Sequence, residues 1–427
     1  MATDELAADA PPAPVGYSVP LRIGEFRGLI SAQVLSELGD QVARVALASL
    51  ILIRSGSVFL MAATFAVSFL PAVLGSALLG SLADRLPRKA ILLSCDLIRA
   101  VLIGAIALLA TDEAPLVLLL GLLFVAELFS APFLAAQQAL LPDVLPEPRD
   151  YLAGAGLVRV LSQFDQVLGL VFAGLVVHLL SVRTALVLDA LSFAVSFLVL
   201  LATLRRRPAA VVDASPGVRG YLRDLGHGAR ITAADPVRRV LVLLGWGAAF
   251  VLIAPEAVAL AYARDRGLSE LAGSLLMATV PAGAALGAYL IGRIDPVRAV
   301  QLLLTLVALA CLPLIATMAD PPVLIAGLLW LISGTCQGFM VPLVTTVNLA
   351  TPREQRGMVN GLAAAGFNIS TTAAFLVVGA LSDLTTPAIA VGAAGIFGLV
   401  VVFASRSVWP RRAVRRAARM SYADHPH

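Results

Sequence analysis

The chain has 427 residues, of which 59% are hydrophobic and only 14% are charged, and its mean hydropathy is +0.92. A sequence with so few polar residues cannot cover a soluble globule of this length, so the composition indicates a membrane protein. The formal net charge of +4 reflects membrane topology and predicts no nucleic-acid partner. Cys95, Cys311 and Cys336 fall within apolar runs, which predicts buried thiols and neither disulfides nor a metal site.

Residues 1–25 begin with an acidic stretch rich in alanine and proline. The stretch lacks the basic and apolar regions of a cleaved signal, so we expect a disordered cytoplasmic tail. Twelve apolar stretches follow, at about 28–53, 57–79, 90–110, 115–141, 153–180, 184–203, 239–262, 272–292, 297–318, 321–348, 360–383 and 386–405. Each is long enough to cross a hydrocarbon core of roughly 30 Å, which takes about 20 helical residues. The sequence therefore predicts an all-α membrane protein of twelve transmembrane helices.

The longest polar stretch divides these helices into two sets of six. We expect an N-terminal six-helix bundle at 26–204, a cytoplasmic linker at 205–238, a C-terminal six-helix bundle at 239–408 and a basic cytoplasmic tail at 409–427. Two short repeats indicate a duplication: Gly121-Leu122-Leu123-Phe124 recurs as Gly327-Leu328-Leu329-Trp330, and Pro148-Arg149-Asp150 recurs as Pro352-Arg353-Glu354. The sequence therefore predicts two pseudo-symmetric halves, which is a known transporter plan.

The basic residues predict the orientation. If both termini are cytoplasmic and the helices alternate, the cytoplasmic segments carry 24 of the 31 Lys and Arg residues and the external loops carry four. This bias fits the positive-inside rule. The arginines between 411 and 419 directly follow the last helix, so we interpret them as attracted to anionic lipid heads. Lys89 is the single lysine, which is typical of a GC-rich bacterial genome, and we expect a bacterial inner membrane.

The loop between the second and third helices carries the strongest motif, Gly80-Ser81-Leu82-Ala83-Asp84-Arg85-Leu86-Pro87-Arg88-Lys89. The glycine allows close helix packing, the aspartate caps helical amides or pairs with arginine, and the basic residues hold the loop at the cytoplasmic surface. A generic positive-inside loop needs only the basic residues. The motif resembles the signature loop of the major facilitator superfamily, and we predict a gating role for Gly80, Asp84, Arg85, Arg88 and Lys89.

Four further segments resemble the branch of that superfamily that exports macrolides and enterobactin. They are Ser36–Asp40, Cys95–Ala100, Leu141–Asp143 and Arg356-Gly357. The resemblance implies efflux of drugs or siderophores by an antiporter, and hence multidrug resistance. The chain departs from the branch in its fourth helix, where Glu127 is the only charged residue, and in its fifth, where Gly169–Gly174 replaces the Gly-Pro pair of drug antiporters.

Gln33, Glu37, Asp40 and Arg44 form one polar stripe on the first helix, because they are spaced by four, three and four residues. Ionisable groups at membrane depth are costly unless they are used, so we expect the stripe to face a central cavity and to bind substrate or protons. Arg44 is expected to compensate one carboxylate and to leave the other free to bind and release a proton. The alternative is a structural ion pair that locks this helix to a neighbour.

Two carboxylates in other helices are further candidates for substrate or proton coupling. Glu127 lies in the fourth helix, and Asp165 lies in the fifth, within two turns of Arg159. The alternative for both is again a pair between helices. Asp96 and Arg99 lie three residues apart in the third helix, and we expect them to satisfy each other in a gating or structural role.

The remaining polar groups differ between the halves. Asp189 and Glu256 are predicted near the external ends of their helices, where an external gate and simple solvation explain them equally well. Uncharged amides and aromatic rings of the second half are expected mainly to join helices, to pack or to face lipid, among them Asn348, Asn368, Trp246 and Phe367. We therefore predict ion coupling in the first half and an apolar cavity surface from the second.

These features predict a secondary transporter, most simply a proton-coupled exporter of small amphipathic organic molecules that works by alternating access. An importer or symporter of the same fold and a non-transporting sensor or scaffold are the alternatives. No Walker loop or catalytic constellation occurs in the sequence, so neither an enzyme nor a cofactor or metal is expected. The expected partners are a small-molecule substrate, protons and membrane lipids, and the chain is expected to act as a monomer.

Overall fold

The computed structural model describes residues 19–111, 113–207, 217–407 and 409, and all the regular secondary structure within them is helical. The predicted N-terminal tail up to residue 18 and the basic tail from residue 410 lie outside the described residues. A short 3-10 turn, Pro20–Arg22, precedes the first helix, which begins at Gly24. The first transmembrane helix therefore starts inside the segment predicted as tail.

Seven helices form the first half: α1 (Gly24–Ser55), α2 (Val58–Arg85), α3 (Arg88–Leu109), α4 (Leu116–Leu128), α5 (Ser130–Val144), α6 (Pro148–Leu179) and α7 (Val182–Thr203). α4 and α5 together form a single apolar span. The break lies at Phe129, whose backbone N–H donates to the carbonyl of Ala126 at 3.2 Å, one residue short of the usual four-residue step. The first half therefore contributes six spans.

The second half follows the amphipathic helix α8 (Gly217–Ala234), which occupies the predicted linker. Its helices are α9 (Pro236–Leu252), α10 (Ala254–Arg264), α11 (Glu270–Ile291), α12 (Pro296–Gln301), α13 (Leu303–Ala316), α14 (Val323–Cys336), α15 (Met340–Leu349), α16 (Arg356–Leu384) and α17 (Pro387–Ser407). Short irregularities divide three spans into pairs of helices, α9 with α10, α12 with α13, and α14 with α15. One of them lies at Ile253, just before Pro255, which has no N–H to continue the helical ladder. This half also contributes six spans.

Ten of these spans are long and apolar enough to cross a membrane by length and composition. The other two are α1, which carries more charge than the rest, and the shorter apolar run Leu303–Ala319. The carboxylates in the middle of α1 are tolerable in a membrane span because Glu37 and Asp40 form hydrogen bonds with polar groups of the first half. The predicted all-helical fold with twelve spans is confirmed.

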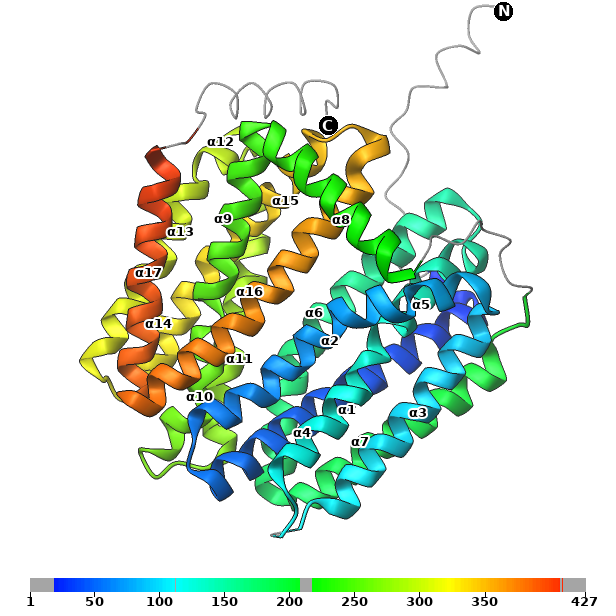
Figure 1. Cartoon of the computed structure of the whole chain (residues 1–427), viewed down its shortest axis with the longest axis horizontal. Coiled ribbons are helices and arrows are strands. Elements are labelled where there is room, and N and C mark those ends of the chain that lie inside the picture. The colour runs from blue at the N-terminus through cyan, green and yellow to red at the C-terminus, as the bar shows by residue number, and fades with distance from the viewer. Residues whose placement is uncertain (1–18, 112, 208–216, 408, 410–427) are drawn as a thin grey trace, which may run out of the picture.

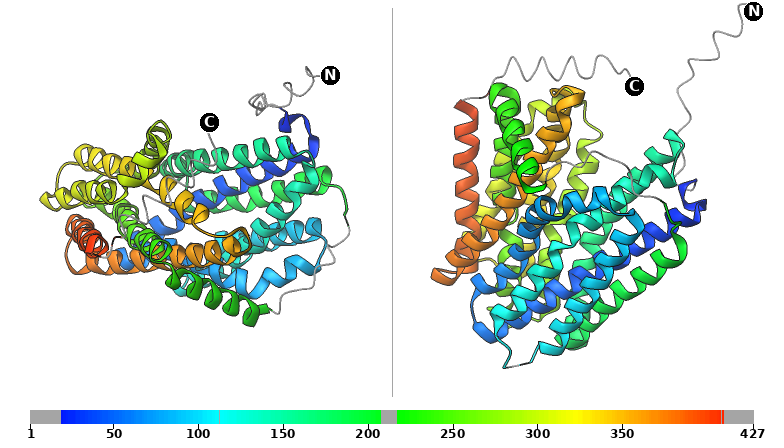
Figure 2. Two further views of the ribbon diagram at one scale, coloured as in Figure 1. Left: turned by 90° about the horizontal axis from the view of Figure 1, so that it is seen from above. Right: turned by 45° about the vertical axis from the view of Figure 1, so that its right-hand side comes forward.

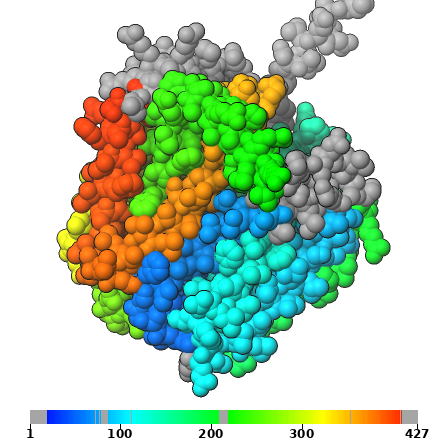
Figure 3. All heavy atoms as spheres, viewed as in Figure 1, coloured from blue at the N-terminus to red at the C-terminus, as the bar shows by residue number. Residues whose placement is uncertain are grey.

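The two halves stand side by side as separate bundles, blue to green and green to red in Figure 1, and the turned views of Figure 2 show the same separation. α2 packs against α16 and α6 packs against α11 where the halves meet. α8 contacts both α16 and α2, and Figure 3 shows it lying across the junction of the two halves. We call this side of the molecule the α8 end and the other side the opposite end.

The halves are sealed together at the opposite end. The carboxylate of Asp383, at the end of α16, accepts hydrogen bonds from the hydroxyl of Ser57 at 2.6 Å and from the backbone N–H of Val58 at 2.6 Å, and so caps α2 across the junction. Gly379 and Gly174 allow the close approach. A Cβ at Gly379 would lie 2.8 Å from the Cβ of Ala62, and one at Gly174 would lie 2.5 Å from the Cβ of Ser274.

Candidate functional site

A buried ion cluster joins three helices of the first half. Nη2 of Arg99, on α3, donates to Oδ1 and Oδ2 of Asp40, on α1, at 2.7 and 2.8 Å. The same nitrogen lies 3.5 Å from Oε2 of Glu127, on α4. Arg99 and Glu127 are each only 5% exposed, and the Arg99 guanidinium lies 4.2 Å from the centre of the Phe193 ring. Asp40 and Glu127, both predicted coupling residues, thus meet Arg99, which was predicted to pair with Asp96.

Asp189 lies beside the same cluster, and its interpretation as a solvated residue at a helix end is wrong. It is fully buried, because Gly39 lets α7 approach α1 so closely that a Cβ at Gly39 would lie 2.3 Å from its Oδ1. Oδ1 accepts from the Ser192 hydroxyl at 3.3 Å, whereas Oδ2 has no hydrogen-bond partner among the described residues. A glycine directly before Asp40 was the available signal, because it permits another helix to come close at that point.

The predicted pairing of Asp96 with Arg99 on one helix is also wrong. Arg44 donates from Nε to the backbone carbonyl of Asp40 at 3.2 Å and lies within electrostatic range of the Glu37 carboxylate. Asp96 accepts from the Ser196 hydroxyl at 2.6 Å, while Arg99 turns to α1. The reason is that α3 packs against α7 as well as reaching α1, so residues three apart on it can meet different neighbours.

The part of the predicted stripe nearer the α8 end forms a second network. The Gln33 amide donates to Oε1 of Glu37 at 2.8 Å and to the Ser162 hydroxyl, on α6, at 3.0 Å. Gln33 also accepts from Gln137, on α5. This network ties α1 to α5 and α6, which the sequence could not indicate because Ser162 and Gln137 carry no distinctive pattern.

Asp165 is 5% exposed and lies within electrostatic range of Glu37, Asp40 and Arg44. The structure therefore associates it with α1 and not with Arg159, its neighbour in sequence. The predicted stripe and Asp165 are brought together. Gln33 is buried, whereas Glu37, Asp40 and Arg44 are half-buried. Among the described residues, no group of three or more His, Cys, Asp or Glu side chains is placed to hold a metal ion.

The predicted gating loop is described in part. The backbone of α2 runs through Gly80, Asp84 and Arg85, and the side chains of Asp84 and Arg85 lie outside the described part of the chain. Arg88 forms an ion pair with Asp143, at the end of α5. The Lys89 ammonium donates to two carbonyls at the end of α7, those of Leu201 and Leu204, at 2.7 and 2.5 Å. The basic residues thus tie the loop to two helix ends of its own half.

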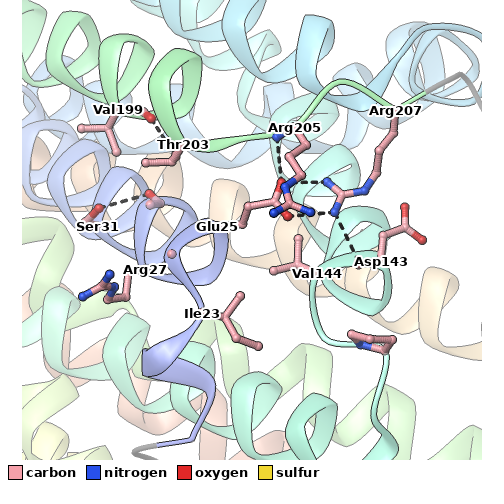
Figure 4. A pocket seen from close by; sticks show the side chains of 13 residues that line it. Ile23, Glu25, Arg27, Ser31, Asp143, Val144, Val199, Thr203, Arg205 and Arg207 are labelled. Atoms are coloured by element: carbon pink, nitrogen blue, oxygen red, sulfur yellow. Dashed lines mark hydrogen bonds and ion pairs between the residues drawn. The ribbon is translucent and has the colours of Figure 1, made fainter.

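The linker is anchored beside this loop. Arg207 donates to both carboxylate oxygens of Glu25 at 3.0 and 2.9 Å, and the Arg205 N–H donates to the same group at 2.7 Å (Figure 4). Burial acts to raise the pKa of Glu25, but the hydrogen bonds and charges of these arginines lower it below its ordinary value of 4.5. The pair lies in a cavity of about 770 Å³ at the α8 end and holds the linker to α1.

A second cavity of about 400 Å³ lies between the two halves, on the α8 side of the sealed contacts. Arg159 of α6 lines it from the first half, and α9, α15 and α16 line it from the second. The wall from the second half includes Trp246, Phe367 and Asn348. These three residues were predicted mainly to pack or to join helices, but they line a cavity. Sequence periodicity could not have shown which residues of the second half face the cavity.

The sequence is similar to that of known membrane transporters. A family model described as Major Facilitator Superfamily matches residues 29–348 and 257–421. An uncharacterized MFS-type transporter of Bacillus subtilis (strain 168), YkuC, is 30% identical over 178 residues, which make up 41% of this chain and 40% of that relative. The chain thus matches less than half the length of this curated relative.

Solved structures of transporters share the fold. The nucleoside transporter NupG superposes with a TM-score of 0.71 at 16% identity, over 90% of this chain and 99% of that one. A bacterial homologue of the human lysosomal transporter Spinster, in an inward-facing and unoccupied conformation, gives 0.67 at 17% identity, over 94% and 98%. A bacterial homologue of the iron transporter ferroportin, in an inward-facing state, gives 0.67 at 16% identity, over 93% and 99%. These likenesses establish the fold.

Proposed function

Because the chain belongs to the major facilitator superfamily, we propose that this MFS-type transporter is a proton-coupled exporter of small amphipathic organic molecules. Its drive would be the proton gradient of a bacterial inner membrane, and it would act as a monomer. The proposal rests on one observation, the buried cluster of Asp40, Arg99 and Glu127 with Asp189 beside it.

The charge balance of this cluster supports proton coupling. Asp40 and Glu127 pair with the Arg99 guanidinium, Asp189 lies within electrostatic range of it, and Arg44 is the further cation within electrostatic range of Glu127. A surplus of buried negative charge is costly, so the cluster is most stable when it holds a proton. Movement of α1 against α3 and α4 would change the distance between Arg99 and its partners. Such a change would couple proton release to the conformation of the first half.

The sealed opposite end supports alternating access. If the α8 end is cytoplasmic, as the basic residues predict, the cavity between the halves lies on the cytoplasmic side of the seal, which corresponds to an inward-facing state. Rocking of the halves would open the contacts at Asp383, Gly379 and Gly174 and close the cavity at the α8 end. The loop at 80–89 would form part of that closure.

Flux in vesicles tests the coupling. Inside-out vesicles holding a pH gradient are given a catecholate siderophore, and proton movement is followed with a pH-sensitive dye. We expect D40N and E127Q to abolish substrate-induced proton release, because each removes a carboxyl from the cluster. D224N, which changes an exposed carboxylate on α8, is the matched control and should behave as the parent. Full proton-linked flux in both cluster variants would refute the proposed coupling.

Direction is tested separately in cells. Deletion of an exporter should raise the intracellular level of its substrate and lower resistance to it. The opposite result would indicate an importer of the same fold.

A further inference from the structure

Arg159 places a charge inside the cavity between the halves. It is the twelfth residue of the 32-residue helix α6, so it lies well within the span. Of the described residues that line the cavity, it is the only charged one. A guanidinium at this depth is costly unless it faces water or a partner of opposite charge.

The nearby carboxylates are engaged elsewhere. Glu37 accepts hydrogen bonds from Gln33 and Ser162, and Asp165 lies toward the charges of α1. No ion pair joins Arg159 to a carboxylate in the part of the chain that the structure describes. Arg159 is an exposed residue, and it lines the cavity. Its charge is therefore available to a ligand.

The facing wall offers an apolar platform. The Trp246 indole is fixed against α16, because its Nε1 donates to the Ala363 carbonyl at 3.1 Å. Gly366 makes room for the ring, since a Cβ there would lie 2.0 Å from the indole Cε2. Phe367 adds a second, exposed ring to the same cavity. An apolar or aromatic body can pack on this surface.

Amides complete the wall. The Asn360 amide donates to Oδ1 of Asn348 at 2.8 Å, which leaves the oxygen of Asn360 and the nitrogen of Asn348 for other partners. Asn368 also lines the cavity. Amide side chains are uncharged, and they form hydrogen bonds with both donors and acceptors of a ligand. The only charge preference of the described lining therefore comes from Arg159.

From this arrangement we infer that the cavity binds an amphipathic organic anion, with Arg159 holding its acidic group and Trp246 and Phe367 packing on its apolar body. The inference rests on the proposed function, because it names the substrate class for the same transport path. Planar guanidinium groups bind carboxylates and phosphates in bidentate fashion, so the acidic group is either of these. An ammonium in the same place would face like charge.

Three dansyl probes with one apolar body and different charge test the inference. They are N-dansylglycine, N-dansylglycinamide and N-dansylethylenediamine, which are an anion, a neutral amide and a cation at neutral pH. The full-length protein is placed in phosphatidylcholine nanodiscs, and dansyl emission is excited through tryptophan, with empty nanodiscs as the blank. Binding near Trp246 gives energy transfer. We expect the parent to bind the anion at least about tenfold more tightly than the amide, and the cation most weakly.

Substitutions assign the preference to Arg159. R159Q should bring the anion to the level of the amide, R159K should keep part of the preference, and R159E should favour the cation. R293Q changes an arginine that stacks on Tyr289 away from the cavity, and it should keep the parent's order. Thermal unfolding of each variant checks that it is folded. Because Arg159 is exposed, none of its variants should unfold.

Three results would overturn the inference: equal binding of the three probes by the parent, no binding by the parent, and an anion preference that survives in R159Q. If the parent prefers the anion, the phosphonate analogue of N-dansylglycine, N-dansylaminomethylphosphonate, shows whether the site binds a phosphonate or a carboxylate more tightly. The test is independent of proton coupling. Proton-linked flux without charge preference would refute this inference alone, whereas anion preference without any proton-linked flux would refute the proposed function alone.

Discussion

The two halves have the same architecture and are held together by different chemistry. The interior of the first half contains the ion cluster around Arg99 and the amide network around Gln33. The interior of the second is held by backbone contact between α11 and α14. A Cβ at Gly287 would lie 1.9 Å from the Thr335 carbonyl oxygen, and one at Gly334 would lie 2.3 Å from that of Val280.

This difference has a physical consequence. Close packing of small residues gives a rigid pair of helices, because any separation loses many contacts at once. Ion pairs and hydrogen bonds between side chains can be exchanged for others, and a proton can alter their balance. We therefore expect the first half to be the one that switches and the second to form a firm wall for the cavity.

The largest expected effect is at Arg99. R99Q leaves Asp40 and Glu127 buried without their cation, so we expect the free energy of unfolding to fall by about 3–5 kcal/mol and transport to be lost. Thermal unfolding in detergent and vesicle flux measure the two effects. An arginine of the second half gives the control, since R293Q should change stability by less than about 0.5 kcal/mol.

A double variant makes the same comparison sharper. D40N/R99Q removes both partners of the 2.7 Å pair, so it should recover much of the stability without recovering flux. Stability that stays as low as in R99Q would show that the ion pair is not the source of the loss.

The second half should respond most to a single methyl group at the α11–α14 contact. G287A introduces a Cβ against backbone that cannot move away as a flexible side chain can, and we expect it to lower stability by about 1–3 kcal/mol. G361A, on α16, adds the same atom where nothing lies within 4 Å. It should be neutral or slightly stabilising, because alanine restricts the unfolded chain. Equal effects of the two variants in thermal unfolding would contradict the packing argument.

The seal between the halves is expected to be weaker than either interior. D383N keeps the shape of the cap but removes its charge, which should weaken the closed opposite end by about 1 kcal/mol. The population that is open at the opposite end should rise about fivefold. Distances between spin labels on α2 and α16 measure this population. An unchanged distance distribution would show that Asp383 does not hold the seal.

The smallest effect is expected at the linker. Because the folded-state pKa of Glu25 is lowered, its stabilising contribution is present above the unfolded value of 4.5 and is lost as pH falls through the folded-state pKa. E25Q should therefore lower the free energy of unfolding by up to about 1 kcal/mol at neutral pH. It should also make the loss of stability at acid pH less steep. D224N, which alters an exposed pair on α8, should leave the acid-side profile unchanged. Thermal unfolding measured against pH distinguishes the two.

Much of the candidate site was visible in the sequence as a set of residues but not as a set of contacts. Asp40, Glu127 and Arg99 stood out because charge in an apolar segment is rare. Their pairing was not predictable, since residues of α1, α3 and α4 meet only when the bundle is assembled. The same limit explains why Asp96 was assigned to Arg99 and not to Ser196, which lies 100 residues away in sequence.

By itself the sequence determined the membrane class, the twelve spans and the two halves. The length and apolarity of a segment are local properties, and they decide whether it can span the lipid bilayer. It also marked the family through the loop at 80–89. Only the tertiary structure decided which charges share a partner, that Asp189 is buried against Gly39, and that Arg159 faces a cavity walled by Trp246 and three asparagines. Those facts depend on how each helix is rotated and on which neighbour it meets, and helix rotation is set by packing across the whole bundle.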